Sequence, residues 1–449
     1  MGDVHLPQGW CISKISEISF KGEQRKPSGD KEFIYVDIGS INRDSKCIES
    51  PLKITGKNAP SRARKVINTG DVLVSLTRPN LNAVALVPKD LNDQIASTGF
   101  EVIKSVWVDS RYIFALTRSK DFIDSISGAV QGALYPAAKS SDVQAYKFSL
   151  PPLEEQKVIA DKLDALLTKV EKNKARLERI SELMKAFRQS VLSAAVSGKL
   201  VSVNNPITVT VGEIATDIRY GTSKKCDYNG GQTPVIRIPN ISDRKLNTSD
   251  LKYADFTEKE LKTLALKVGD ILVIRSNGSL DLVGKPALVE QKYEGFLYAG
   301  YLIRIRCNEK KILPSFLLNI MNSRVVRDVV EISSRSTSGV NNINSKELAA
   351  LKFVLPSIEE QAEIVQYVEK FFDFADSIEQ KANVALERVN NLTQSIFAKA
   401  FRGELTADWR TANPDLVSGE NSAESLLEKI KAERKALEAA KKTRTRKNV

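Results

Sequence analysis

The chain has almost no histidine and little cysteine. Its one histidine in 449 residues is His5, so catalysis by a histidine base and metal sites that need histidine ligands are nearly excluded. The four cysteines, Cys11, Cys47, Cys226 and Cys307, are far apart and form no Cys-x-x-Cys pair, which excludes a zinc ribbon and a thioredoxin-like redox pair. A chain of this size needs no disulfide framework, so we expect reduced thiols in a cytoplasmic protein.

Catalytic and membrane motifs are also absent. There is no Gly-x-Gly-x-x-Gly after a predicted strand and no Gly-x-x-x-x-Gly-Lys-Ser/Thr, so no cradle for a dinucleotide or for ATP phosphates is predicted. Neither the Asn/Asp-Pro-Pro-aromatic tetrapeptide of amino-methyltransferases nor a nuclease carboxylate cluster occurs. No stretch approaches the roughly 18 apolar residues of a membrane span. The sequence therefore predicts a binding protein with no catalytic site, no metal and no cofactor of its own.

Positive charge is in excess and unevenly distributed. Lys and Arg number 67 against 55 Asp and Glu, which gives a net charge of +12 and a pI near 9.3. The net charge is +4 over residues 1–150, +3 over 151–200, +5 over 201–350 and zero over 351–449. We therefore expect an anionic partner that meets residues 1–150 and 201–350, and double-stranded DNA suits two related basic segments.

The sequence repeats itself at a constant offset of 205 residues. LPPLEEQ at 150–156 recurs as LPSIEEQ at 355–361, QSV at 189–191 as QSI at 394–396, and GKL at 198–200 as GEL at 403–405. A constant offset over about fifty residues indicates one continuous helix in each copy, because a helix tolerates no insertion without rotating its faces. The prolines stop any helix upstream, and Gly198 and Gly403 end the two helices.

Apolar residues in both copies recur at alternate steps of four and three, which is typical of a coiled-coil seam. We predict that the two helices pack antiparallel with a pseudo-twofold relation between the copies. The predicted seam includes Leu163, Leu166, Val170, Asn173, Leu177, Ile180 and Phe187 in the first copy and Val368, Phe371, Ile378, Val389, Leu392 and Ile396 in the second.

The segments before the helices are similar to each other in outline. Gly70-Asp71-Val72-Leu73 is echoed by Gly269-Asp270-Ile271-Leu272, and short β-branched runs predict strands, with helices at 121–127 and 315–330. We predict a mixed α/β chain with domain 1 at 1–150, helix 1 at 151–200, domain 2 at 201–350, helix 2 at 351–405 and a tail at 406–449 with a charged helix over 423–442.

Cationic and amide side chains flank predicted strands in both domains. Arg suits guanine and Asn suits adenine because each can make two hydrogen bonds to a base edge in the major groove. Lys is better suited to phosphate, which positions a protein without specifying sequence. Arg78-Pro79-Asn80 and Arg275-Ser276-Asn277 follow matching predicted strands, so we predict that they occupy equivalent loops. The alternative is that these segments are solvated loops. The candidate DNA contacts are Arg62, Arg64, Lys65, Arg78 and Asn80 in domain 1 and Arg219, Lys224, Lys225, Arg275 and Asn277 in domain 2.

The repeated Pro-x-Leu/Ile-Glu-Glu-Gln opening of a long helix resembles the conserved regions of the specificity (S) subunits of type I restriction-modification enzymes. The Gln-Ser-Val/Ile and Gly-Lys/Glu-Leu ends, the repeated Gly-Asp-Val/Ile-Leu strand and Leu6–Trp10 resemble the same family. Asn390–Ala407 is similar to the enterobacterial K-type (IA) branch.

This resemblance covers essentially the whole chain and implies a non-catalytic DNA-specificity subunit. Two target recognition domains would each read half of a split, asymmetric DNA site. The helices would bind two methyltransferase (modification) subunits, and restriction (translocase/nuclease) subunits would complete the complex. S-adenosylmethionine for adenine methylation, ATP and Mg²⁺ would then be held by the partners. From the residues alone, a coiled-coil scaffold that bridges two proteins is the main alternative; a self-sufficient methyltransferase or nuclease lacks any motif.

Overall fold

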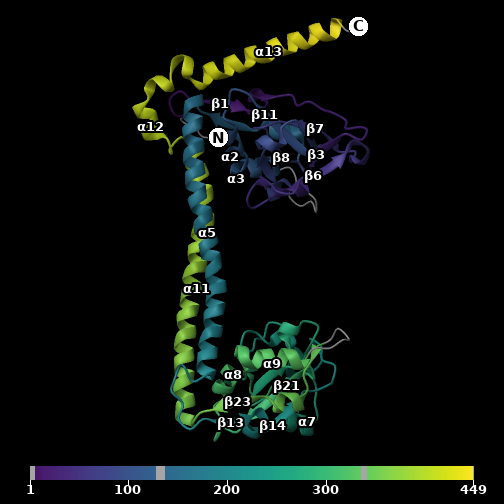
Figure 1. Ribbon diagram of the computed structural model, residues 1–449, viewed down its shortest axis with the longest axis vertical. Helices are drawn as coiled ribbons and strands as arrows, with labels where there is room; N and C mark the ends of the chain where they lie inside the picture. Colours follow the sequence, from purple (N-terminus) through teal and green to yellow (C-terminus); the bar gives the residue numbers. More distant parts are fainter. Residues whose placement is uncertain (1–5, 128–136, 335–340, 448–449) are drawn as a thin grey trace. The chain divides into compact units, whose positions relative to one another are not determined.

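The computed structural model describes residues 6–127, 137–334 and 341–447, with side chains of the last helix up to residue 437. His5 and the last two residues of the predicted tail, 448–449, lie outside the described residues. The chain forms two compact units, Met1–Arg176 with Ala385–Val449 and Leu177–Val384, which we call the first and the second unit. Each unit contains one α/β domain and one part of each long helix (Figure 1).

The α/β domain of the first unit is built on two four-stranded sheets. Their strand orders are β6-β3-β10-β7 and β2-β11-β8-β9, and β8 is buried along its whole length. Helix α2 packs on the second sheet through Tyr112, Ile113 and Leu116. The strands are β2 (Ser19–Phe20), β3 (Glu32–Val36), β6 (Leu52–Thr55), β7 (Ala63–Ile67), β8 (Val72–Ser75), β9 (Val84–Leu86), β10 (Gln94–Ser97) and β11 (Phe100–Ser105); the main helices are α2 (Ser110–Thr117), α3 (Lys120–Ser127) and α4 (Ser140–Ala145).

The second unit repeats this plan with a four-stranded sheet, β14-β21-β17-β19, and a three-stranded sheet, β16-β15-β20. Strand β17 corresponds to β8 and is likewise buried at every residue. The strands are β14 (Ala215–Tyr220), β15 (Thr233–Ile236), β16 (Lys252–Ala254), β17 (Ile271–Ile274), β19 (Pro286–Leu288), β20 (Leu297–Tyr298) and β21 (Leu302–Cys307); the helices are α7 (Glu258–Leu264), α8 (Pro314–Asn322), α9 (Arg324–Ser334) and α10 (Ser345–Ala349).

A two-stranded antiparallel ribbon closes each α/β domain at the base of a long helix. In the first unit β1 (Cys11–Lys14) pairs with β12 (Lys147–Leu150), and in the second β13 (Ile207–Thr210) pairs with β23 (Lys352–Leu355). Because the second strand of each ribbon leads directly into a long helix, the ribbon fixes where the domain meets that helix.

The two long helices, α5 (Leu153–Val196) and α11 (Ile358–Phe401), are both 44 residues long and keep the offset of 205 residues. The glycine that follows each helix, Gly198 or Gly403, has a left-handed backbone with φ of 68° or 75°, as expected of a residue that ends a helix.

The repeated glutamine of the helix opening fastens each helix to its domain. Gln156 accepts a hydrogen bond from the backbone N–H of Asp109, just before α2, and donates one to the carbonyl of Pro151. Gln361 makes the same two bonds, with the N–H of Leu313 before α8 and the carbonyl of Pro356. Both glutamines are fully buried. The repeated Glu-Glu-Gln therefore marks a joint between helix and domain.

The helices pack antiparallel within each unit. In the first unit Ile159 and Leu163 of α5 share a core with Phe397 and Ala400 of α11. In the second unit Phe187 of α5 lies against Phe371 of α11, with ring centroids 6.1 Å apart. The predicted antiparallel pairing of the two helices is confirmed inside both units.

Most predicted seam residues face the partner helix, but two do not. Asn173 is exposed and Leu392 is 47% exposed, whereas the neighbours Lys174 and Thr393 are partly buried. The buried face also uses Leu167 and Phe397, one position after the strict repeat. An α-helix drifts about 20° per heptad from a 3.5-residue repeat, so the contact face moves to the next residue. Leu163, Val170, Val368 and Ile396 are buried, and Leu166, Leu177, Ile180, Phe187, Phe371, Ile378 and Val389 are partly buried.

The segment after α11 is part of the first unit and shares its core. It contains α12 (Ala407–Ala412) and α13 (Ala423–Lys447), which includes the predicted charged helix. The carboxylate of Glu155, fully buried, accepts hydrogen bonds from Trp10 Nε1 (2.8 Å), Thr406 Oγ1 (2.6 Å) and Arg410 Nη2 (2.7 Å). This carboxylate therefore ties the start of the chain, the start of α5 and the C-terminal segment together.

The predicted mixed α/β class with two similar domains and two long helices is confirmed. One predicted helix is wrong in detail, because 315–330 is two helices, α8 and α9, separated at Ser323. This residue is buried in an extended conformation, and its hydroxyl donates to the carbonyl of Ile320 (2.6 Å), which ends α8.

The four cysteines are free, and in the described part of the chain no helix is long and apolar enough to cross a membrane. The domain boundaries predicted at 150, 200, 350 and 405 stay a prediction.

Candidate nucleic-acid interface

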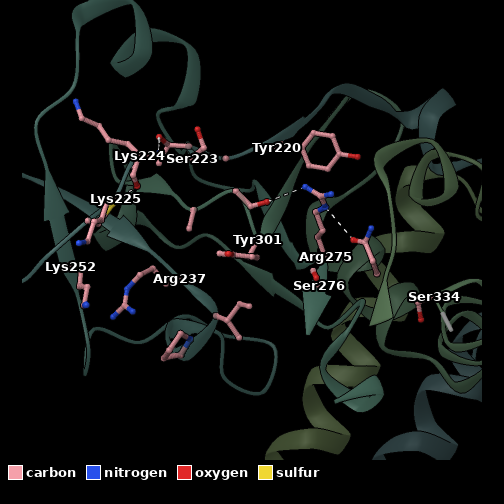
Figure 2. Close-up of a pocket in the computed structure, with 18 residues that line it drawn as sticks. Tyr220, Ser223, Lys224, Lys225, Arg237, Lys252, Arg275, Ser276, Tyr301 and Ser334 are labelled. Atoms are coloured by element: carbon pink, nitrogen blue, oxygen red, sulfur yellow. Dashed lines mark hydrogen bonds between the residues drawn. The ribbon is translucent and has the colours of Figure 1, made fainter. Parts of the chain in front are cut away.

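The second unit contains a cleft of about 1190 Å³ on its α/β domain (Figure 2). The segment from the end of β14 to Cys226 forms one wall, and Arg275 and Ser276, directly after β17, form another. Residues 237–239 after β15, Lys252 of β16 and the 299–301 segment after β20 complete it. The cleft thus lies where several strands of both sheets end.

Every charged side chain among the described lining residues is a cation. These cations are Lys224, Lys225, Arg237, Lys252 and Arg275. Arg237 is partly neutralised by Asp250 outside the lining, at 2.8 Å, and hydrogen bonds from Tyr228 and Arg237 lower the pKa of that carboxyl. With no carboxylate among its described lining residues, the cleft favours an anionic ligand.

Arg275 is held in place on the cleft wall by neutral groups. Its guanidinium lies over the ring of Tyr220, 4.6 Å from the centroid, and Nε donates to Asn342 Oδ1 at 3.2 Å. A longer contact of 3.5 Å joins Nη1 to the carbonyl of Gly300. Tyr220 is itself fixed, because its hydroxyl accepts a hydrogen bond from the N–H of Ser345 (2.8 Å). Arg275 therefore has a defined orientation and only neutral partners in these contacts (Figure 2).

The floor of the cleft needs a glycine. A Cβ atom on Gly221 would lie 2.1 Å from the carbonyl oxygen of Tyr298 and 2.4 Å from that of Ala299, both of them backbone atoms. Beneath the floor Tyr298 is fully buried and lies against Arg304, whose guanidinium pairs with Asp217 and reaches the carbonyl of Ala265 at 3.1 Å. This packing gives the cleft a rigid base.

Of the five residues predicted in domain 2, the structure brings Lys224, Lys225 and Arg275 together in the cleft. Arg219 does not line it; its side chain is exposed and pairs with Asp217 at 3.1 Å. Asn277 does not line it either, because its amide oxygen accepts a hydrogen bond from the N–H of Ser279 and so holds a local turn.

Sequence reasoning missed Arg237, Lys252 and Tyr301. Tyr301 is 64% exposed and lies between the two cationic sides of the cleft in Figure 2. Each of the three follows or lies in a short strand, like Arg275, but the strands β16 and β20 are only three and two residues long. Strands this short give little periodic signal from which they could be predicted.

In the first unit the basic run Arg62–Lys65 is largely within a strand, not before one. Arg64 and Lys65 belong to β7. Lys65 Nζ donates to the carbonyl of Phe100 (2.6 Å) and pairs with Glu101 (3.1 Å), with both side chains mostly buried. Arg64 Nη1 donates to the carbonyl of Ala63 (2.8 Å) and Arg62 is exposed. Lys65 is thus an internal cation rather than an exposed one.

Arg78 and Asn80 lie in a loop after β8 and both are exposed. Arg78 and Asn82 flank the turn Pro79–Leu81 with left-handed backbones, φ of 49° and 46°. A left-handed conformation strains the backbone of a residue other than glycine, so surrounding contacts must stabilise it. Here Lys46 Nζ donates a hydrogen bond to the carbonyl of Asn82 (2.6 Å).

The two post-strand loops are not aligned as predicted. Phe100 of β11 is opposite Ser75, and Leu302 of β21 is opposite Ile274, so Ser75 corresponds to Ile274. Arg275 therefore corresponds to Leu76, and Arg78 to Asn277. The predicted equivalence of Arg78 with Arg275 is therefore wrong. The pairing of the strands decides which loop residues correspond, and the similar composition of the two loops does not.

A cavity of the first unit has different chemistry. It measures about 350 Å³ and its lining combines Lys21, Lys65 and Arg434 with Glu23 and Glu101. The mixed charge makes it a poorer match to an anion than the cleft of the second unit.

Comparison with known proteins gives one family. The model of the type I restriction modification DNA specificity domain matches twice, over residues 7–182 and 207–388. The chain is 35% identical to the EcoKI specificity subunit of Escherichia coli K12, covering 98% of both chains. It is also 35% identical to the StySPI specificity subunit of Salmonella potsdam, covering 98% of this chain and 99% of that one.

Two solved structures are similar over most of the chain. One, from work on complex assembly and conformational transition of the type I R-M system, has a TM-score of 0.76 at 27% identity and covers 89% of this chain and 99% of that chain. The HsdS subunit of Thermoanaerobacter tengcongensis has a TM-score of 0.61 at 27% identity and covers 90% and 99%.

Proposed function

The chain belongs to the specificity subunits of type I restriction-modification systems, with two recognition domains, and we propose that it directs adenine methylation and DNA cleavage by partner subunits to a split, asymmetric site. The observation that carries this is the duplicated recognition domain, one copy of which has a cleft with five cations and no carboxylate among its described lining residues.

In this proposal each recognition domain reads one half of the site. The joint made by Gln156 in one unit and Gln361 in the other holds each domain on a long helix, so the helices govern the presentation of the domains to DNA. Double-stranded DNA supplies closely spaced phosphates, which suits the Lys side chains of the cleft.

The partners proposed are two methyltransferase subunits, bound through the helices, and restriction subunits that complete the complex in the cytoplasm. This chain would do no chemistry itself. S-adenosylmethionine, ATP and Mg²⁺ would bind to the partners; this chain's part would be to hold duplex DNA in register with them. The family relationship supports this division, and one structural neighbour comes from a study of type I complex assembly.

Binding to random and selected duplexes tests the function. The full chain with its methyltransferase subunits is used to select from a pool of random duplexes, and its affinity is then measured at several salt concentrations. We expect affinity to fall steeply with salt, and the selected duplex to bind about a thousandfold or more better than random DNA. A complex that selects no sequence would contradict DNA reading and favour a protein scaffold.

A further inference from the structure

The residue directly after strand β8 of the first recognition domain differs from the residue directly after the corresponding strand β17 of the second. In the second domain it is Arg275, on the wall of the cationic cleft, and in the first it is Leu76. The same backbone position thus presents a planar cation in one domain and an apolar side chain in the other. A position that the fold holds constant while its side chain changes is suited to specificity.

The contacts of Arg275 fix it without neutralising it. Tyr220 supports one face of the guanidinium, and Asn342 and Gly300 supply neutral oxygen acceptors for Nε and Nη1. Among the described residues no carboxylate pairs with Arg275, and no hydrogen bond engages Nη2. Both hydrogens of Nη2 and the second hydrogen of Nη1 are donors that a ligand could use.

The other cations are held differently. Lys224 and Lys252 lie near aromatic rings, at 5.2 Å from the centroid of Phe256 and 4.8 Å from that of Tyr228, and Lys225 is exposed. They lie on one side of the cleft, and Arg275 lies on the other beside Tyr220 (Figure 2). Flexible ammonium groups suit phosphates, whereas a fixed guanidinium suits a planar acceptor pair.

We propose that Arg275 is the base-reading residue of the second recognition domain, that it recognises guanine through N7 and O6, and that Lys224, Lys225 and Lys252 contact phosphates. The proposal rests on the function proposed above. Guanine is the base that presents two acceptors side by side in the major groove, which match two N–H groups of one guanidinium. The cations come from separate chain segments spread around the cleft, which fits a row of phosphates better than a single free nucleotide.

The test removes each partner of this contact in turn. The full chain is expressed with its methyltransferase subunits, and the site is identified by mapping methylated adenines. Binding of the wild-type complex is then measured to duplexes in which each guanine of the second domain's half-site is replaced by 7-deazaguanine, which lacks the N7 acceptor. We expect one such replacement to weaken wild-type binding markedly, and the same replacement to have almost no effect on the Arg275→Ala complex.

Base substitution gives the second readout. Arg275→Ala should lose discrimination at that base pair by about 10- to 100-fold while the other half-site is read as before. Lys224→Ala should weaken binding to all duplexes alike and reduce the salt dependence by about one unit of slope. Arg275→Lys keeps the positive charge but lacks the paired N–H groups of a planar guanidinium. It should therefore resemble Arg275→Ala in its discrimination between bases. Lys310→Ala, which removes an exposed cation outside the cleft, is the matched control and should change neither.

The outcomes separate this inference from the function on which it rests. If the wild-type complex selects a split site but Arg275→Ala and Arg275→Lys keep every base preference, the reading role of Arg275 is wrong and the function stands. If Arg275→Ala leaves DNA reading intact but abolishes binding of free ATP to the complex, the cleft is a nucleotide site and the proposal fails. If no site is selected, the function itself fails. Continued reading of the first domain's half-site shows that each variant still assembles with its methyltransferase subunits.

Discussion

The two recognition units share a backbone plan but differ in how their domains are attached to the long helices. In the first unit Arg111 of α2 pairs with Asp161 (2.6 Å) and Asp164 (3.4 Å), and Arg118 lies 3.8 Å from Glu171, all on α5. In the second unit, at the corresponding positions of α8, Arg111 is replaced by Ser315 and Arg118 by Asn322. There Arg244 lies over the ring of Phe372 of α11, 4.5 Å from the centroid.

The helix openings differ in the same way. Glu155 is buried among Trp10, Thr406 and Arg410, whereas its counterpart Glu360 is only partly buried and accepts hydrogen bonds from the backbone N–H groups of Asn204 and Ser357. Buried strands and the Gln joints are kept in both units, while charged side chains at the edges have diverged. The two units thus share the contacts that position each domain on its helix. They differ in the charged side chains around those contacts.

The largest difference in stability between the two units should come from the buried carboxylate of Glu155. Arg410→Met leaves Glu155 without its charged partner, and breaking a buried pair costs about 3–5 kcal/mol. All three tryptophans, Trp10, Trp107 and Trp409, lie in the first unit, so urea unfolding followed by tryptophan fluorescence reports on that unit alone. We expect a large shift of the midpoint to lower urea.

The matched change in the second unit is Glu360→Gln, followed by hydrogen exchange of the β17 and β21 amides. Its effect on stability should be much smaller, because Glu360 is only partly buried and has no salt bridge among the described residues. Equal effects of Arg410→Met and Glu360→Gln on their own units would contradict the asymmetry.

The stability of the two units should also depend differently on pH, because of two equivalent cations, Lys46 and Arg244. Both residues have a left-handed backbone conformation. Burial lowers the pKa of Lys46 from 10.5 to about 8, with a smaller effect from the charge of Arg118. Between these values the unfolded chain holds a proton that the folded chain has released, so this residue makes the first unit more stable as pH rises through that window. Arg244, whose pKa is also lowered by burial, stays charged there.

Urea unfolding of the first unit at pH 7.5 and 9.5 measures this contribution. Lys46→Met should lose the rise seen in the wild-type chain, and Arg244→Met should leave it unchanged. If wild type and Lys46→Met respond to pH alike, Lys46 is not the group responsible.

The smallest difference should be in salt sensitivity. Replacing both Asp161 and Asp164 with Asn removes two ion pairs of Arg111 whose carboxylates are more than half exposed, and such pairs contribute about 0–1 kcal/mol. The third ion pair of Arg111, with the mostly buried Asp109 at 3.0 Å, is kept. The loss should be measurable by tryptophan fluorescence at low salt and vanish near ~0.5 M salt, where screening is nearly complete. Phe372→Leu in the second unit, followed by hydrogen exchange of the β17 and β21 amides, should show no such salt dependence. A loss of stability in the Asp161→Asn/Asp164→Asn variant that persists at high salt would mean that packing, not charge, is the cause.

The sequence predicts the long helices and their pairing well because their signals are redundant. Prolines, an offset of 205 residues, heptad spacing and terminal glycines all agree on α5 and α11. Individual seam positions are predicted less well, since Asn173 and Leu392 lie one residue away from the contact face.

The candidate interface is predicted only in part. Lys224, Lys225 and Arg275 belong to segments with visible basic composition, but Arg237 and Lys252 join them only through the pairing of β15 with β16. Lys65 has the composition of a DNA contact, yet Glu101, 36 residues away, pairs with it. Contacts between distant strands decide which cations are exposed, and a single sequence does not encode those contacts locally.

The central claim is that two recognition domains each read one half of a split site. Mapping methylated adenines in a genome that expresses this chain with its methyltransferase subunits tests it most directly. The account predicts two short specified blocks separated by an unspecified spacer of fixed length, and a change in one block only when Arg275 is replaced by alanine. One continuous motif, or methylation with no sequence preference, would contradict it.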